Sequence, residues 1–203
     1  QLDIPSPVDI GRLIAAAEWV NPALPAFIRL AAASGARRGE LCALRWRNID
    51  FEARSLHIAG AIVQINKTVI EKDTKTHAER RVALDEGTVR VLEALRDRMV
   101  LALAIAEEEL PSDAFVFSHR PDGLLPWYPN YATLAFARLA DREGIGHVRL
   151  HDLRHFAATT MLVNGVDVRT TAGRLGHAQS STTLNVYAHF VQAADAGAAR
   201  AIG

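Results

Sequence analysis

The sequence has little of several features that would indicate a particular class of protein. Its 203 residues include a single cysteine, Cys42, which excludes an internal disulfide and fits a reducing compartment. No apolar run reaches the roughly 18 to 20 residues that a membrane-spanning helix needs. No signal peptide stands at the N-terminus. We therefore expect a cytoplasmic protein that does not contact a membrane.

An excess of charge of one sign is also absent, because 23 basic residues balance 23 acidic ones. This balance argues mildly against a nucleic-acid ligand, since affinity for phosphate comes largely from Lys and Arg. The acidic residues are concentrated, however: residues 85–113 hold eight acids and three arginines. A block of this kind can face away from a polyanion while other surfaces remain basic.

Most of the chain has the apolar periodicity of helices, and one part is rich in short strands. Helices are expected at about 7–19, 22–33, 85–110, 128–142, 151–163, 167–175 and 182–187, with a short one that begins after 37 and ends near 46. Strands are expected at 49–51, 55–58, 61–65 and 80–84, with an extended piece at 115–118. Residues 72–77 are polar and read as a hairpin turn with lysines at its tip. The pattern predicts one α+β domain that is mainly helical.

Residues 151–187 concentrate groups that can act on a phosphate. His151 and Arg154 are three apart on a predicted helix, so an imidazole and a guanidinium share one face and can converge on one phosphate. His177 follows, and ten residues later Tyr187 offers an oxygen nucleophile that can form a covalent phosphotyrosine. Because the transition state of phosphoryl transfer gathers negative charge, preorganised cations are the main catalytic resource. This stretch predicts a site of phosphoryl transfer on DNA.

The same predicted helix permits a different interpretation, a metal site. His151 and His155 are four apart, which is the spacing of a helical pair of metal ligands. The zinc-protease pattern needs a glutamate directly after the first histidine, where this sequence has Asp152, and a third ligand is not evident. We therefore interpret His155 as a packed or orienting histidine, and we expect no metal and no cofactor.

Five segments in order resemble the motifs of the tyrosine recombinases, also called phage-type integrases, over nearly the whole chain. They are SGARRGEL at 34–41, TKT and RRVAL within 74–84, HDLRH at 151–155, LGH at 175–177 and TLNVYAH at 183–189. A His-x-x-Arg pair alone is common, but five segments in the required order are specific. Ala83 departs from the proline that is common in relatives, and Ser34 from the usual threonine.

The resemblance implies a mainly helical catalytic domain with a small three-stranded antiparallel sheet, spanning residues 1–203. Because the sequence begins at Gln1 rather than at a methionine, we expect a fragment whose core-binding or arm-binding domains lie further N-terminal. In this family Arg37, Arg154 and His177 would hold the nonbridging oxygens of the scissile phosphate. Glu40 would orient the first arginine. His151 would assist proton transfer or orientation.

The resemblance also implies the remaining chemistry. Tyr187 would attack the phosphate and form a 3′-phosphotyrosine, without metal or ATP. Lys75 would protonate the leaving 5′ oxygen, although Lys72 is close and the register of the hairpin is open. We expect Arg37 and Lys75 to fold onto His151, Arg154 and His177 around one phosphate-sized space. Tyr187, on a short helix, is expected to be able to stand away from that space when DNA is absent.

The implied partner is double-stranded DNA with specific recombination sites, bound by a homotetramer that is a monomer without DNA. Accessory proteins that bend DNA and a location on the nucleoid would accompany this role. Two other functions stay open at this point. The first is a DNA-binding relative that has lost catalysis. The second is a metal-dependent nuclease that uses His151 and His155.

Overall fold

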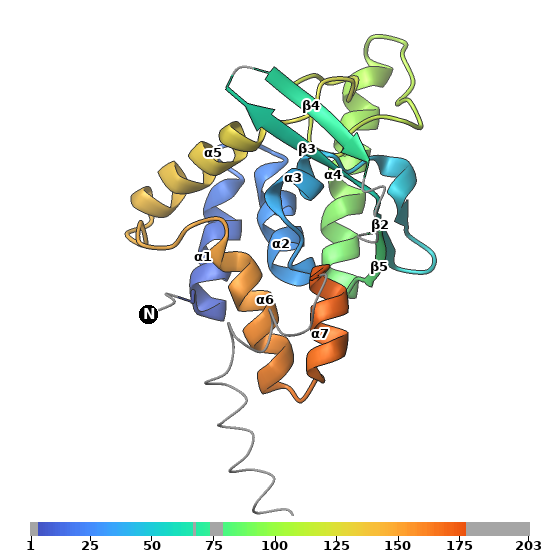
Figure 1. Ribbon diagram of the computed structural model, residues 1–203. Coiled ribbons are helices and arrows are strands. Elements are labelled where there is room, and N and C mark those ends of the chain that lie inside the picture. The colour runs from blue at the N-terminus through green and yellow to red at the C-terminus, as the bar shows by residue number, and fades with distance from the viewer. Residues whose placement is uncertain (1–3, 67, 74–78, 178–203) are drawn as a thin grey trace, which may run out of the picture.

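The computed structural model describes residues 4–66, 68–73 and 79–177 (Figure 1). Its helices are α1 (Pro7–Ala17), α2 (Leu24–Ser34), α3 (Arg38–Cys42), α4 (Glu86–Ala104), α5 (Pro129–Arg142), α6 (Asp152–Val163), α7 (Val168–Leu175) and a 3₁₀ turn, η1 (Trp46–Asn48). Its strands are β1 (Ile49–Asp50), β2 (Ser55–Ile58), β3 (Gly60–Ile65), β4 (Thr68–Asp73) and β5 (Arg80–Ala83). The prediction of a mainly helical α+β domain is confirmed.

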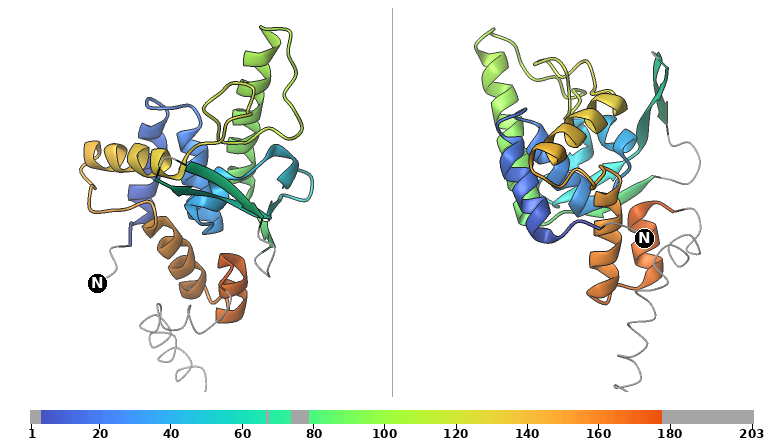
Figure 2. Two further views of the ribbon diagram at one scale, coloured as in Figure 1. Left: turned by 45° about the horizontal axis from the view of Figure 1, so that its top comes forward. Right: turned by 90° about the vertical axis from the view of Figure 1, so that its left-hand side faces the viewer.

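Helix α2 forms the centre of the helical body. Nine of its eleven residues are buried, and α1, α4 and α6 pack around it (Figures 1 and 2). The helix ends at Gly35, whose φ of 64° lies in the left-handed region. A Cβ on Gly35 would lie 2.4 Å from Leu175 Cδ2, so glycine also lets α7 approach closely. The chain therefore leaves α2 directly beside the end of α7.

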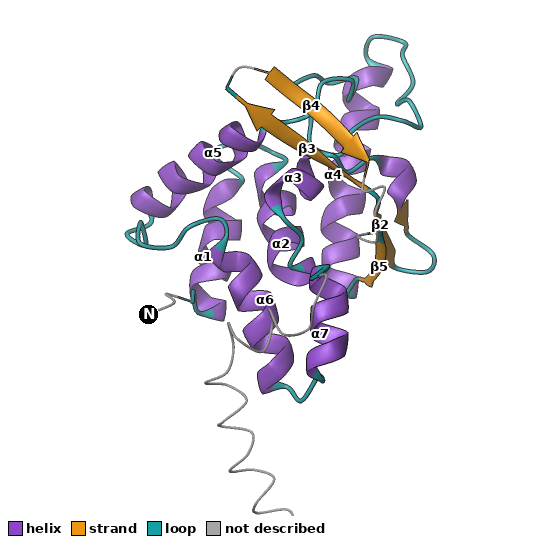
Figure 3. Ribbon diagram, in the orientation of Figure 1, coloured by secondary structure: helices purple, strands orange, loops and turns teal. Residues whose placement is uncertain are grey.

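The strands form two separate sheets (Figure 3). The predicted three-stranded antiparallel sheet is confirmed, in the order β1-β2-β5. Strand β3 pairs with β4 in a separate ribbon beside α3 and α5. Lys72 was expected in a turn, but it lies within β4 opposite Ala61. The chain reverses earlier, next to Asn66, which has a left-handed φ of 55°.

The segment between α4 and α5 differs most from the expectation. Helix α4 ends at Ala104, before the predicted 110, and the next residue, Ile105, is 88% exposed. The extended piece expected at 115–118 makes only isolated bridges, at Phe115 and Ser118. Phe117 is nevertheless buried, with its ring centroid 4.9 Å from that of Phe27 on α2. This segment contributes to the core without belonging to a sheet.

The other predicted helices agree with the structure within a few residues at each end. Their boundaries follow from local capping: Ser6 accepts from the backbone N–H of Asp9, and Asp167 accepts from that of Thr170. The helix expected at 182–187 lies outside the described residues. No described helix is both long and apolar enough to cross a membrane.

Candidate active site

Arg37 lies where the chain enters α3, and its side chain is 46% exposed. It is the N-cap residue of that helix. Glu40, in the first turn, folds back and accepts hydrogen bonds from the backbone N–H of Arg37 at 2.7 Å and from its Nη1 at 2.9 Å. A carboxylate at this position is favourable because the first N–H groups of a helix lack intrahelical partners. Glu40 therefore stands where it can orient Arg37.

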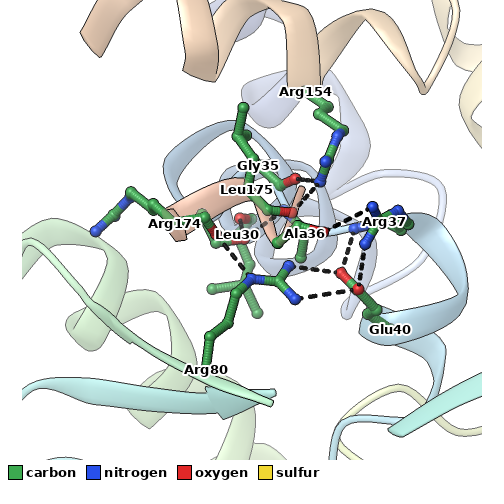
Figure 4. Close-up of polar contacts among 11 residues, drawn as sticks. Leu30, Gly35, Ala36, Arg37, Glu40, Arg80, Arg154, Arg174 and Leu175 are labelled. Carbon is green, nitrogen blue, oxygen red and sulfur yellow. Dashed lines mark hydrogen bonds and ion pairs between the residues drawn. The ribbon is translucent and has the colours of Figure 1, made fainter. Parts of the chain in front are cut away.

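The carboxylate of Glu40 also binds a second arginine, Arg80 on β5 (Figure 4). Arg80 Nη1 and Nη2 donate to the two carboxylate oxygens at 3.1 and 2.7 Å. The two side chains are only 8% and 4% exposed. Burial acts to raise the pKa of Glu40, but hydrogen bonds and charge from Arg80, together with Arg37, outweigh it and hold the pKa below its ordinary value. Glu40 thus stays ionised inside the protein.

Arg154 lies near the start of α6 and is buried, with 5% of its surface exposed. Its Nη1 donates to the carbonyl of Gly35 at 2.6 Å and to that of Leu175 at 2.8 Å. One guanidinium therefore joins the end of α2 to the end of α7. Because both acceptors lie in the interior, loss of this donor would leave them without that hydrogen bond.

The C-terminal end of α7 brings the arginines together (Figure 4). Its last carbonyls lack intrahelical partners and carry partial negative charge, so they are good acceptors for guanidinium groups. Three successive carbonyls each accept from a different arginine: Arg174 O from Arg80 Nε at 2.7 Å, Leu175 O from Arg154 Nη1 at 2.8 Å, and Gly176 O from Arg37 Nη2 at 2.9 Å. Segments far apart in sequence therefore converge on one helix end.

His177 follows directly after this helix end. Gly176, with a left-handed φ of 71°, turns the chain away from α7, and a Cβ there would lie 2.6 Å from Arg80 Nη1. Glycine is thus needed both for the backbone conformation and for the space. Burial, followed by the charges of Arg154 and Arg37, lowers the pKa of His177 to about 4. The imidazole is therefore neutral at physiological pH in the absence of a bound anion.

His151 and His155 lie against each other at the start of α6, with ring centroids 4.9 Å apart. Burial lowers the pKa of both imidazoles. The buried carboxylate of Asp152 accepts from the backbone N–H of Arg149 at 2.8 Å and from its Nη2 at 2.9 Å, which fixes the start of the helix. In the described part of the chain, no group of three or more His, Cys, Asp and Glu side chains could hold a metal ion. The metal interpretation gains no third ligand there.

A cavity of about 450 Å³ opens beside the two catalytic candidates Arg37 and Arg154, and His151 also lines it. Arg38 and Arg149 add two further positive charges, while alanine and leucine side chains form much of the wall. A larger cavity, of about 580 Å³, lies among α1, α2, α6 and α7, but none of the predicted site residues lines it. The smaller cavity is therefore the better candidate for a phosphate of the substrate.

The structure brings together most of the residues predicted for the site. Arg37, Arg154 and His177 meet around the end of α7, and His151 joins the two arginines at the cavity. Lys75 and Tyr187 lie outside the described residues, so their predicted places in the site stay predictions.

Arg80 is the residue of this network that sequence reasoning did not single out. The available signal was the alternation of strand β5, in which Arg80 shares a face with the buried Val82 while Arg81 points outward and is exposed. A buried arginine needs buried acceptors, and here one of them is a buried carboxylate. Only the folded structure identifies that acid as Glu40, 40 residues earlier in the chain.

Known proteins with similar sequences include recombinases and integrases. The tyrosine recombinase XerC-like protein of Caldanaerobacter subterraneus subsp. tengcongensis is 26% identical over 185 residues, which cover 83% of this chain and 46% of that protein. The ICEBs1 integrase of Bacillus subtilis is 25% identical over 172 residues, which cover 80% of this chain and 44% of the integrase. The chain thus spans less than half the length of these curated relatives.

Solved structures of the same kind share the fold. The XerA recombinase matches with a TM-score of 0.70 and 25% identity, over 89% of this chain and 58% of that one. The Tn1549 transposon integrase, solved with transposon right end DNA, matches with a TM-score of 0.79 and 17% identity, over 100% of this chain and 67% of that one. The predicted tyrosine recombinase catalytic-domain fold is confirmed. Because the model of the phage integrase family matches residues 7–193, the chain belongs to that family.

Proposed function

We propose that residues 1–203 form the catalytic domain of a site-specific DNA recombinase, which cleaves and rejoins DNA through a covalent 3′-phosphotyrosine. In the whole protein, core-binding or arm-binding domains precede this one. Family membership supports the proposal, as do the names of relatives that are recombinases and integrases. The Tn1549 integrase was solved with DNA, and DNA is the substrate that we propose here.

The observation that carries the proposal is the convergence of Arg37 and Arg154 on adjacent carbonyls of α7, next to His177. A phosphodiester already carries negative charge, and more gathers around phosphorus in the transition state. Two fixed guanidinium groups and one imidazole can stabilise that charge without reorganising during the reaction. The neutral His177 can donate a hydrogen bond to an oxygen of the phosphate, and a bound anion would also favour its protonation.

In the proposed reaction, the phenolic oxygen of Tyr187 bonds to phosphorus as the bond from phosphorus to the 5′ oxygen breaks. The phenol gives up its proton, with His151 assisting proton transfer or orientation, and Lys75 supplies a proton to the departing 5′ oxygen. A 5′ hydroxyl from a partner strand then attacks the phosphotyrosine, the bond from phosphorus to the Tyr187 oxygen breaks, and the diester and the free phenol are restored. His155 packs beside His151 and orients it. Neither a metal ion nor ATP takes part.

The proposed assembly is a homotetramer on two DNA sites that separates into monomers without DNA. Accessory proteins that bend DNA assist it, and the protein acts in the cytoplasm on the nucleoid. Charge distribution supports a DNA-binding face in spite of the zero net charge, because basic side chains gather at the candidate site. The acidic residues of the α4 segment lie elsewhere in the sequence.

Trapping of a covalent adduct tests the function. The full-length gene product is incubated with a duplex that carries its recombination site and a nick beside the scissile phosphate, so that the short leaving strand diffuses away. We expect a protein–DNA adduct that Tyr187→Phe abolishes and that forms equally in the presence of a chelator. Tyr128→Phe is the matched control, because it removes a phenolic hydroxyl elsewhere in the chain. An adduct that persists in Tyr187→Phe contradicts the nucleophile, and a chelator-sensitive cleavage would indicate a metal-dependent nuclease.

A modified substrate tests the proposed acid. A 5′-bridging phosphorothiolate has a leaving thiolate that departs without protonation, so it should restore cleavage by Lys75→Ala. Lys72→Ala is the paired variant, because Lys72 is exposed on β4. Rescue of Lys72→Ala, with none of Lys75→Ala, would move the role to Lys72.

A further inference from the structure

We propose that Arg80 is a positioning residue of this site: its guanidinium binds Glu40 and the end of α7 together, and so sets where Arg37 and His177 stand for cleavage. The inference rests on the proposed recombinase function. It assigns Arg80 no contact with DNA, because its side chain is only 8% exposed.

Arg80 and Arg37 together fill the acceptor sites of one carboxylate. Each oxygen of an ionised carboxylate has two lone-pair sites. Oε1 of Glu40 accepts from Arg37 Nη1 and Arg80 Nη1, and Oε2 accepts from the backbone N–H of Arg37 and from Arg80 Nη2. The bidentate grip of Arg80 fixes the plane of the carboxylate. Because the plane of the carboxylate is fixed, the direction from which Arg37 can donate to it is fixed too.

The same guanidinium also fixes the position of α7. Arg80 Nε donates to the carbonyl of Arg174 at 2.7 Å. The backbone of Gly176 packs against the guanidinium so closely that a Cβ would lie within 3.1 Å of its Nη1, Cζ and Nε atoms. His177 is the next residue. One rigid planar group therefore sets both the acid that orients Arg37 and the helix end that presents His177.

The buried ion pair between Arg80 and Glu40 serves geometry more than stability. Burying two charges costs desolvation free energy, and an apolar pair of similar volume is often equally stable. Arginine adds what apolar side chains lack, a fixed fork of donors that reaches three acceptors in known directions. A lysine has the charge, but its ammonium group cannot span both carboxylate oxygens and the carbonyl of Arg174. The role of Arg80 therefore depends on its geometry as well as on its charge.

Single-turnover cleavage by Arg80 variants tests the inference. We expect Arg80→Gln and Arg80→Lys to cleave the nicked duplex about 10²-fold more slowly at saturating DNA, because small misplacements of catalytic groups have effects of this size. Their dissociation constants for DNA should stay within about threefold of wild type, the level expected when no phosphate contact is lost. Arg81→Gln is the matched control, since it removes the same charge from the exposed face of the same strand. It should cleave within about threefold of wild type.

Titration of His177 by NMR tests the same contact without using activity. Arg80→Gln should raise the pKa of His177, because the charge of Arg80 is among those that depress it. Arg81→Gln should leave it unchanged. Circular dichroism checks that each variant is folded at the assay temperature. If Arg80→Gln does not fold, Arg80→Lys, which keeps the charge, carries the cleavage test.

Two results would overturn the inference. One is cleavage by folded Arg80→Lys at the wild-type rate, which would mean that charge alone is needed. The other is a His177 titration that does not respond to Arg80→Gln. If wild-type protein formed no adduct, the proposed recombinase function would fail, and the titration would still decide whether Arg80 sets the surroundings of His177.

Discussion

The start of α3 and the start of α6 each present an arginine to the end of α7, but the two regions are built differently. Arg37, at α3, is 46% exposed and is held by the carboxylate of Glu40. Arg154, in α6, is 5% exposed and donates to the carbonyls of Gly35 and Leu175. One arginine is thus supported by an ion network at the surface, and the other by backbone groups of the interior.

The difference shows which arginines of the site stabilise the fold and which are proposed to bind the phosphate. Around Arg154, two hydrogen bonds that join the ends of α2 and α7 are made by the same guanidinium that is proposed to bind the phosphate. Around Arg37, the structural ion pair belongs to Arg80 and Glu40, and the guanidinium of Arg37 lies on its exposed side. Catalysis and stability should therefore be separable at α3 and inseparable at α6.

Truncation of each arginine has the largest expected effect. Arg154→Ala and Arg37→Ala should each slow single-turnover cleavage by about 10²- to 10³-fold, the usual cost of losing a donor to transition-state charge. Their effects on the free energy of unfolding should differ. Arg154→Ala should lower it by roughly 1–3 kcal/mol for each of the two carbonyls that lose a donor. Arg37→Ala should lower it by about 1 kcal/mol or less. Urea denaturation and the nicked-duplex assay measure the two quantities.

An exposed arginine provides the control for this pair. Arg47 is 60% exposed and forms an ion pair with Asp113. Arg47→Ala should change the free energy of unfolding by no more than about 0.5 kcal/mol. Equal destabilisation by Arg37→Ala and Arg154→Ala would break the proposed division between the two regions.

Neutralising Glu40 tests the ion network of the α3 region. Glu40→Gln keeps the shape of the side chain but leaves the buried Arg80 without a carboxylate, so the free energy of unfolding should fall by about 3–5 kcal/mol at neutral pH. Glu86→Gln is the control, because Glu86 is 66% exposed in its pair with Arg90. That change should cost about 0.5 kcal/mol or less.

The pH dependence of this effect follows from the lowered pKa of Glu40. A carboxylate whose pKa is lower in the folded state contributes stability above its ordinary pKa, here 4.5, and loses it as the pH falls through the folded value. The difference in stability between wild type and Glu40→Gln should therefore be constant near neutrality and narrow below about pH 4.5. A difference that stayed constant into strong acid would contradict the ionised state of Glu40.

The same two regions show which features of the site could be predicted from the sequence. Arg37, Glu40, His151, Arg154 and His177 were all predicted from short motifs. The structure brings Arg37, Arg154 and His177 to the end of α7 and His151 to the adjoining cavity. Most helix boundaries, apart from the end of α4, were also predictable, because caps and glycines act locally. These properties depend on residues a few positions apart, which a sequence displays directly.

The support beneath the site was not predictable in the same way. Arg80 reads as an ordinary strand residue until its partners, Glu40 and the carbonyl of Arg174, lie beside it, and they are 40 and 94 positions away. Lys72 was misplaced for a related reason, because strand register depends on where the chain turns, and that turn came earlier than its polar residues indicated. The role of Arg80 and the position of Lys72 both depend on tertiary contacts, which a single sequence does not display.

The smallest expected effect is a shift in the titration of His177, which can rank the influence of the two regions. Because its pKa is about 4, His177 becomes protonated at a lower pH in the folded protein than in the unfolded chain, where the pKa of histidine is near 6.5. Stability should therefore fall as the pH drops from about 6.5 to 4, and His177→Gln should remove that part of the slope. Burial is the largest cause of the low pKa, and the charge of Arg154 lowers it more than that of Arg37. Arg37→Gln should consequently raise the pKa less than Arg154→Gln does, as NMR titration of the imidazole would measure. A larger rise with Arg37→Gln would mean that the charge at α3 influences the pKa of His177 more than the charge at α6 does.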